Sequence, residues 1–366
     1  MKIIKVEIGK IKIPLKKPFI TALRHVDFAE DIIIKIITDT GNIGFGNAPP
    51  TAVITGDSQA SVIAAIQEVI APQIIGRDIC ELETICNCID KSMLHNSSAK
   101  AAVDIAIYDL FAQMCNLPLY KLLGAYRTKI KSDLTISLRE PEIMAKDAIE
   151  AVKNGYVDLK IKVGNDLSLD FERIRAIRQA VGNDINIRLD ANQGWKPKEA
   201  VRIIRQFEDK NLNIELIEQP VVARDTVGLK FVTDNVDTPI MADESAFSVY
   251  EVFELLANRA CDLINIKLMK AGGIHNALKI ADMAKTCGVE CMMGCMLESK
   301  VGITASASLA GGKSIITKAD LDAADLLATD PVVGGISYDK NQIILNENIG
   351  LGITDIDNWK FIAQVK

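Results

Sequence analysis

Charged residues end a series of apolar segments in the central part of this 366-residue chain. A single acidic residue in such a place is usually a helix cap or a turn residue. Independent capping would not select lysine, then three carboxylates, then lysine again in chain order. The set consists of Lys160, Lys162, Asp190, Glu218, Asp243 and Lys267.

The three carboxylates predict a metal site. Carboxylates that lie close together repel one another unless a cation neutralises them. Ligation by oxygen alone suits Mg²⁺, which keeps positions open for water or substrate. We therefore predict one Mg²⁺ per subunit, held by Asp190, Glu218 and Asp243.

The three lysines indicate the reaction in which this metal ion would take part. Lys160 and Lys162 are two residues apart, so both side chains point to one face of a strand, and Lys267 is expected on the opposite side of the substrate. A proton beside a carboxylate is very weakly acidic, and Mg²⁺ stabilises the enediolate that its removal creates. We predict Lys162 and Lys267 as the two bases. Mg²⁺ and the neighbouring Lys160 are expected to lower the pKa of Lys162, while Lys160 serves as a cationic partner of the enediolate.

The surrounding sequence predicts the elements that position these residues. The first part alternates apolar and polar residues and contains the turn signal Gly41-Asn42, which is typical of a small antiparallel sheet, and helical patterns follow it. From about residue 130, β-rich runs alternate with helical segments at intervals of about 25 residues, which favours a TIM-type (β/α)7-8 barrel whose last helix is incomplete. The runs are 134–138, 159–163, 187–190, 214–218, 240–243, 263–267, 290–293 and 315–318. An open doubly wound sheet is the alternative, but the sequence contains no G-x-G-x-x-G turn to support it.

Composition limits the other classes of function. Hydrophobic residues make up 49% of the chain and charged residues 25%, with a net charge of -6, so there is no basic footprint for nucleic acid or for an acidic membrane surface. No apolar run approaches the roughly 20 residues of a membrane span. The eight cysteines are scattered without a zinc spacing, which predicts reduced thiols and a cytoplasmic location.

The ordered set of segments resembles the enolase superfamily, in its muconate-lactonising-enzyme-like subgroup, for which a lysine base and Mg²⁺ are known. The matching segments are Leu159–Lys162, Leu189–Asn192, Ile217–Pro220, Ala242–Ser245 and Asn265–Lys267. The resemblance implies an α+β capping domain over residues 1–125, a catalytic barrel over 126–324 and a tail over 325–366 that completes the cap. We expect the tail segment 343–345 to return to the N-terminal sheet. The resemblance also implies a homo-oligomer.

Residues outside the core set bear on the substrate. Asp320 and Asp322 are spaced to project from one face and suit an ammonium group, although two acids at the start of a helix are also common. They resemble the D-x-D of dipeptide epimerases, which holds the substrate's α-ammonium. Arg24 lies in a loop that in this family closes over the site, and the resemblance implies that it pairs the side-chain carboxylate of a glutamate. A solvated surface charge is the simpler interpretation of Arg24.

Three further residues are expected at the rim of the barrel. Ser137 and Met296 are predicted substrate contacts, and Glu298 is either another contact or a structural partner of a nearby lysine. The combined hypothesis is an isomerase, a dipeptide epimerase that acts on L-Ala-D/L-Glu. The alternatives are an epimerase of another dipeptide, an N-acylamino acid racemase, an o-succinylbenzoate synthase, a muconate cycloisomerase, or a barrel that only binds a ligand.

Overall fold

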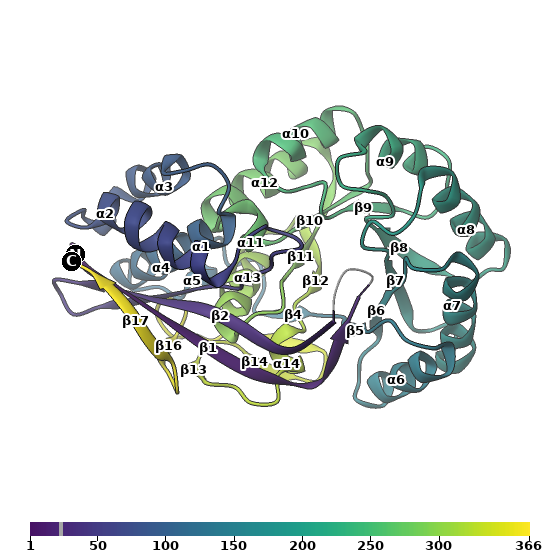
Figure 1. Ribbon diagram of the computed structural model, residues 1–366, viewed down its shortest axis with the longest axis horizontal. Coiled ribbons are helices and arrows are strands. Elements are labelled where there is room, and N and C mark those ends of the chain that lie inside the picture. The colour runs from purple at the N-terminus through teal and green to yellow at the C-terminus, as the bar shows by residue number, and fades with distance from the viewer. Residues whose placement is uncertain (22–24) are drawn as a thin grey trace.

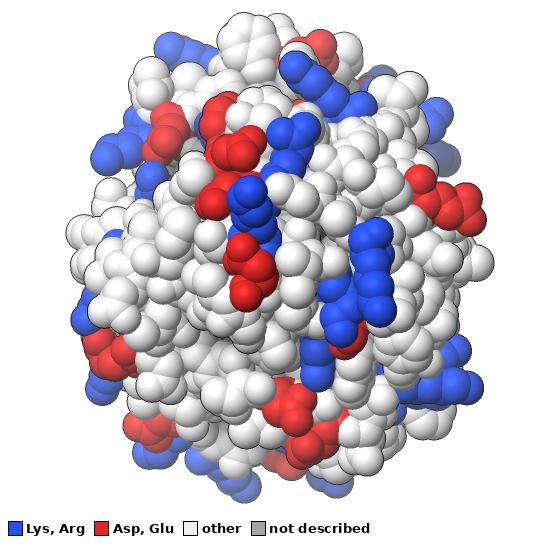
Figure 2. Space-filling model, turned by 90° about the vertical axis from the view of Figure 1, so that its left-hand side faces the viewer, with Lys and Arg blue, Asp and Glu red and all other residues white. Residues whose placement is uncertain are grey.

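The computed structural model describes residues 1–21 and 25–366. Arg24 therefore lies outside the described residues. The ribbon shows a cap of long antiparallel strands and helices beside a barrel whose helices lie on its outer surface (Figure 1). On the end of the molecule formed by the cap, basic and acidic side chains are interspersed (Figure 2). No helix in the described part of the chain is long and apolar enough to cross a membrane.

The cap sheet joins the two ends of the chain. Its strand order is β17-β1-β2-β3, and every pairing is antiparallel. Val6 in β1 pairs with Val365 in β17. The predicted turn at Gly41 joins β2 to β3, and the φ of Gly41 is +82°, a conformation that favours glycine. The strands are β1 (Ile3–Ile20), β2 (His25–Thr38), β3 (Ile43–Ala48) and β17 (Lys360–Val365).

Helix α4 (Ser97–Met114) lies against this sheet and is buried along most of its length. Gly44 and Gly46 in β3 permit the close approach. A Cβ atom at Gly46 would lie 1.9 Å from the carbonyl oxygen of Ala102 in α4, so a larger residue would push the helix away. The remaining cap helices are α1 (Gln59–Ala64), η1 (Ala65–Ile70), α2 (Ala71–Ile74), η2 (Ile79–Glu81), α3 (Leu82–Lys91) and α5 (Leu119–Leu122).

The barrel follows the predicted pattern. Within the described residues, eight parallel strands pair in chain order from β5 to β12. They are β5 (Leu134–Ile136), β6 (Asp158–Lys162), β7 (Asn186–Asp190), β8 (Ile214–Glu218), β9 (Ile240–Ala242), β10 (Leu263–Ile266), β11 (Glu290–Gly294) and β12 (Ile316–Asp320). Next to β5 and β12, the Asp133 amide donates to the carbonyl of Ala319 at 3.2 Å, which brings the first and last strands together.

Helices cover the outside of the barrel strands. They are α6 (Pro141–Lys153), α7 (Leu167–Val181), α8 (Pro197–Asp209), α9 (Thr226–Thr233), α10 (Val249–Ala257), α12 (Ile274–Cys287) and α13 (Lys300–Gly312). The short α11 (Leu268–Ala271) follows the end of β10 and contacts the cap helix α4. After β12 only the short α14 (Ala323–Leu326) forms before the chain leaves the barrel, so the predicted incomplete last helix is confirmed.

The tail differs from one expectation. Segment 343–345 does not return to the N-terminal sheet, because β15 (Gln342–Ile344) pairs with β4 (Lys129–Lys131) and β14 (Ser337–Asp339). The buried Ile343 belongs to the same apolar cluster as the barrel residues, which explains this position. β13 (Val332–Gly334) pairs with β16 (Ile353–Ile356), and β17 is the tail strand that extends the cap sheet.

Candidate active site

Strand alternation brings the predicted residues to the inside of one rim. In β6, Leu159 and Ile161 pack in the large apolar cluster, while Lys160 and Lys162 take the alternate positions. Asp190 and Glu218 are the last residues of β7 and β8. The other rim residues are Asp243 and Lys267, each directly after a strand, and Asp320, the last residue of β12; all of these charged side chains are buried.

Lys160 lies at the centre of the carboxylates. Its Nζ is 3.0 Å from Asp190 Oδ2 and 2.8 Å from Glu218 Oε2. The same Nζ lies 2.7 Å from Asp320 Oδ2, on the far strand β12. One ammonium group therefore connects β6, β7, β8 and β12.

The two predicted bases enter from opposite sides of the barrel. Lys162 Nζ lies 2.6 Å from Asp190 Oδ2 on the β6 side. Lys267, which follows β10, has its Nζ 2.7 Å from Asp243 Oδ2. Both lysines line the same cavity, so a substrate in it would have an amine on each side.

Burial and the neighbouring charges shift the pKa values of the three carboxylates in different directions. Burial raises the pKa of Glu218 to about 8, and the negative charge of Asp190 acts in the same direction. Burial also acts to raise the pKa of Asp190 and Asp243, but the nearby lysine ammonium groups hold both below their ordinary value. A further cation beside Glu218 would favour its ionised form.

The donor set fits Mg²⁺ in its chemistry. Asp190, Glu218 and Asp243 offer carboxylate oxygens on neighbouring strands. As the side chains stand, no three acidic, histidine or cysteine residues of the described chain form a metal-binding group, and the Nζ atoms of Lys160 and Lys267 contact the carboxylates instead.

Two orphaned acceptors give further support for a hydrated cation. Asn192 Oδ1 and Glu244 Oε2 are buried without a hydrogen-bond partner among the described residues. Both side chains line the cavity. Such oxygen atoms suit the water molecules that Mg²⁺ retains.

The cavity is lined by residues of both the cap and the last barrel strands. Phe19, Thr21, Val53 and Ile54 reach it from the cap, and Met296 reaches it from the segment after β11. The space measures about 60 Å³. The cap therefore contributes to any substrate contact in this cavity.

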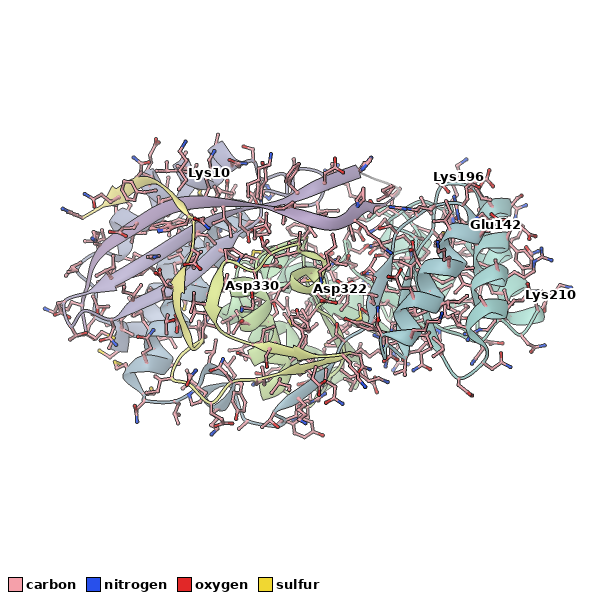
Figure 3. The ribbon with its side chains drawn as sticks, turned by 90° about the horizontal axis from the view of Figure 1, so that it is seen from below. Lys10, Glu142, Lys196, Lys210, Asp322 and Asp330 are labelled. Carbon is pink, nitrogen blue, oxygen red and sulfur yellow. The ribbon has the colours of Figure 1, made fainter. Side chains whose placement is uncertain are left out.

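Asp320 and Asp322 lie together on the β12 side of the cavity. Asp322 Oδ2 accepts a hydrogen bond from the Thr135 amide at 2.7 Å, and its side chain makes no capping bond to α14, the helix that it precedes. Burial and the charge of Asp320 raise the pKa of Asp322 to about 7. Asp322 lies in the middle of the molecule, between the cap and the barrel strands (Figure 3). This position is one that suits an ammonium group of a bound ligand.

The other predicted contacts are placed differently from one another. Met296 lines the cavity. Ser137 does not line it and instead accepts a hydrogen bond from the Ile20 amide at 3.3 Å. Glu298 lies behind the cavity wall, where it accepts from the Met296 amide and from Asn47 Nδ2 of the cap, at 3.0 and 3.1 Å. Its partners in the described chain are thus an amide and an asparagine rather than a lysine.

The sequence reasoning missed several polar residues of the site. Asn192 and Glu244 follow the predicted metal ligands within two residues, a signal that was available in the sequence. Asn265 precedes Lys267 by two residues, so strand alternation points it to the same face. Lys270 gave no signal, because it lies on a helix after the strand.

Comparisons with known proteins agree with this geometry. Residues 3–124 match the model of the mandelate racemase / muconate lactonizing enzyme N-terminal domain, and residues 143–358 match the enolase C-terminal domain-like model. The L-Ala-D/L-Glu epimerase of Clostridium acetobutylicum is 54% identical over 351 residues, which cover 96% of this chain and 98% of the relative. The L-Ala-D/L-Glu epimerase of Bacillus subtilis is 53% identical over 354 residues, 96% of this chain and 97% of the relative.

Solved structures show the same arrangement of the chain. The substrate-liganded complex of the Bacillus subtilis epimerase superposes with a TM-score of 0.97 at 53% identity, covering 97% of this chain and 99% of that one. The hydrophobic dipeptide epimerase of Enterococcus faecalis is 47% identical over 97% of this chain and 100% of its own length. The dipeptide epimerase structure from Enterococcus faecalis with Mg and L-Leu-L-Tyr has a TM-score of 0.94 over 97% of this chain and 100% of that one.

Proposed function

Because this chain belongs to the mandelate racemase / muconate lactonizing enzyme family, we propose that it is a dipeptide epimerase that inverts the α-carbon of the C-terminal residue, with L-Ala-D/L-Glu as its substrate. The observation that carries the proposal is the cavity between Lys162 and Lys267, with Asp320 and Asp322 on its β12 side. The lysine pair matches the α-proton of a dipeptide, and the two acids match its free ammonium group.

The two lysines would exchange a proton across the α-carbon. One neutral lysine removes the proton from its face, and the electron pair left on carbon delocalises into the neighbouring carboxylate. The ammonium form of the other lysine returns a proton to the opposite face, which inverts the centre. In the reverse direction Lys162 and Lys267 exchange roles.

The buried carboxylates would serve the metal ion. Asp190, Glu218 and Asp243 would hold one Mg²⁺ per subunit, and the relatives crystallised with Mg and a dipeptide support this assignment. When bound, Mg²⁺ would neutralise the charge that develops on the substrate carboxylate. Lys160, with its Nζ among the carboxylates, would remain an ammonium and add positive charge beside the same group.

The ammonium site favours a dipeptide over the elimination substrates of this family. Asp320 is already paired with Lys160, so Asp322 is the buried acid that would face an uncharged part of a cycloisomerase or synthase substrate, an arrangement that costs free energy. A dipeptide places its ammonium there. The homo-oligomer and the cytoplasmic location remain predictions.

A hydrophobic C-terminal residue is the second candidate. Phe19, Ile54, Met296 and Leu297 line the cavity, and the Enterococcus faecalis relative carries the name hydrophobic dipeptide epimerase. Arg24 is the residue that we propose to distinguish the two, because a guanidinium pairs with the side-chain carboxylate of a glutamate and not with an apolar side chain.

The test is proton exchange in D₂O. The protein is incubated with MgCl₂ and either L-Ala-L-Glu or L-Leu-L-Tyr, and ¹H NMR follows the α-proton of the second residue while chiral chromatography follows its inversion. We expect rapid deuteration and inversion of glutamate. Faster turnover of L-Leu-L-Tyr would replace the glutamate assignment by the hydrophobic one, and exchange in neither dipeptide would refute the epimerase.

A further inference from the structure

We infer that Lys270 and Asn265 are positioning residues, which hold Asp243 and Glu218 in the orientation needed to bind a divalent cation. The inference rests on the metal site of the proposed function and extends it to two residues that are not among those lining the cavity. It follows from the contacts of one buried ammonium group and one buried amide group.

Lys270 is tied to two strand ends. The residue is 2% exposed, and its Nζ donates to Asp243 Oδ1 and to the Asp243 carbonyl, each at 2.5 Å. A further bond of 3.0 Å runs to the Asn265 carbonyl. An ammonium group has three N–H donors, so these contacts use all of them. Lys270 is therefore committed to the ends of β9 and β10, whereas Lys267 faces the cavity.

Local structure explains why Lys270 reaches back to the carboxylate. Lys267 is the residue before α11, and its carbonyl accepts from the Lys270 amide at 3.0 Å. One helical turn thus places Lys270 above the end of its own strand. Gly272, with a φ of +83°, ends this turn in the left-handed conformation.

Asn265 extends the connection to the next carboxylate. Its Nδ2 donates to Glu218 Oε1 at 2.8 Å, inside the barrel. Gly294 on β11 leaves room for this side chain, because a Cβ atom there would lie 2.4 Å from Asn265 Oδ1. Through its side chain and its carbonyl, Asn265 links Glu218 to Lys270.

The two oxygens of Asp243 are divided between two lysines. Lys270 holds Oδ1, and Lys267 holds Oδ2 at 2.7 Å. A base lysine has to release its carboxylate when it acts on a substrate. The ammonium group of Lys270 then remains bound to Asp243 Oδ1 and holds the carboxylate in one orientation, with Oδ2 available to a metal ion.

The expected loss of Mg²⁺ affinity follows from the effect of such supporting contacts in other metal sites. Loss of a residue that orients a metal ligand typically weakens metal affinity about 10–100-fold. We expect Lys270→Met to fall in this range, because methionine keeps the length and volume but provides no donor. Asn265→Leu should weaken binding about 10-fold, since Glu218 loses a neutral donor only.

The experiment is calorimetric titration of MgCl₂ into the EDTA-stripped full-length protein, without dipeptide. Arg178→Met is the matched control. Arg178 is a buried cation that donates to backbone carbonyls, those of Gly182, Ile185, Leu212 and Asn213, before β7 and β8 at the other end of the barrel. Arg178→Met should lower the melting temperature and leave the Kd for Mg²⁺ within twofold of the wild type.

The outcomes separate the possible roles. A Kd for Mg²⁺ raised at least 10-fold in Lys270→Met, with the Arg178 control unchanged, supports the inference. If Lys270→Met does not fold, the neutral Asn265→Leu variant decides in its place. A Kd within threefold of the wild type in the folded variants would overturn it. Because no dipeptide is present, a wild-type protein that binds Mg²⁺ but epimerises nothing would refute the proposed function and leave this inference standing.

Discussion

Replacing Lys267 by alanine should separate the chemistry of this site from its stability. The side chain is a proposed base on the β10 side of the cavity, and its Nζ is bound to Asp243 Oδ2. Removing it leaves Asp243 with the ammonium of Lys270 on the other oxygen. The substitution therefore does not strand a buried carboxylate without a cation.

The expected magnitudes follow from these contacts. Breaking a buried ion pair and leaving one charge alone costs about 3–5 kcal/mol, and the loss of unfolding free energy here should be smaller because Lys270 remains. General acid–base catalysis contributes about 10²–10⁴ in rate, or roughly 3–5 kcal/mol of activation free energy. We expect Lys267→Ala to fold and to lose epimerisation by at least 100-fold.

The assay uses both epimers of the dipeptide in D₂O. With Lys162 intact, the variant should still exchange the α-proton of the epimer that faces Lys162, and it should not exchange the other or invert either. Lys162→Ala should show the complementary preference. ¹H NMR measures exchange, and chiral chromatography measures inversion.

Lys285→Ala is the control, because Lys285 is an exposed lysine in the last turn of α12. Its epimerisation rate should stay within twofold of the wild type. Inversion by Lys267→Ala within tenfold of the wild type would refute the two-base reasoning. Equal exchange of both epimers by this variant would refute it as well.

Three other substitutions test the substrate contacts and the cap. Asp322→Asn should raise the KM for L-Ala-L-Glu about 30-fold, since losing a buried charge partner costs roughly 2 kcal/mol or more, and an unchanged KM in steady-state kinetics would remove Asp322 from the ammonium site. Arg24→Ala should raise the KM for L-Ala-L-Glu at least 10-fold and leave that for L-Leu-L-Tyr unchanged; equal effects on both would contradict the pairing with glutamate. Burial raises the pKa of Asp104 from 3.8 to about 7, so between these pH values the folded protein holds a proton on this side chain that the unfolded chain releases. The resulting contribution to the free energy of unfolding is complete below about pH 4 and is lost as pH rises to 7, at up to about 1.4 kcal/mol per pH unit. Asp104→Asn keeps an acceptor for the Ile274 amide but does not titrate. Its melting temperature minus that of the wild type should therefore increase from pH 5 to pH 8. A difference that does not change with pH would contradict a buried Asp104 that titrates in this range.

The barrel and its rim could be predicted because both depend on short-range patterns. Each β-rich run carries its own period of two, and the parallel strands of a barrel end on one rim. The side chains of Lys160, Asp190 and Glu218 could therefore be expected together before any contact was known, and the Nζ of Lys160 lies within 3.0 Å of both carboxylates. The incomplete last helix was also predictable, since the tail returns to strand-like patterns.

Predictions that depended on long-range pairing succeeded less well. The sequence does not specify which sheet an isolated strand joins, and β15 joined β4 because Ile343 is buried with the barrel residues. Ser137 has the strand position of a rim residue, but the Ile20 amide of the cap binds its hydroxyl. Glu298 is likewise held by Asn47 of the cap.

The sequence by itself determined the order of the charged residues and the face of each strand that they occupy, because alternation is a local property of the backbone. Tertiary structure alone decided which groups became partners. Lys270 and Asp243 are 27 positions apart, and a turn of helix brings them into contact. Such a contact depends on how helix and strand pack, so Lys267 could be identified as a proposed base from its position, whereas Lys270 could be identified as a positioning residue only from the folded chain.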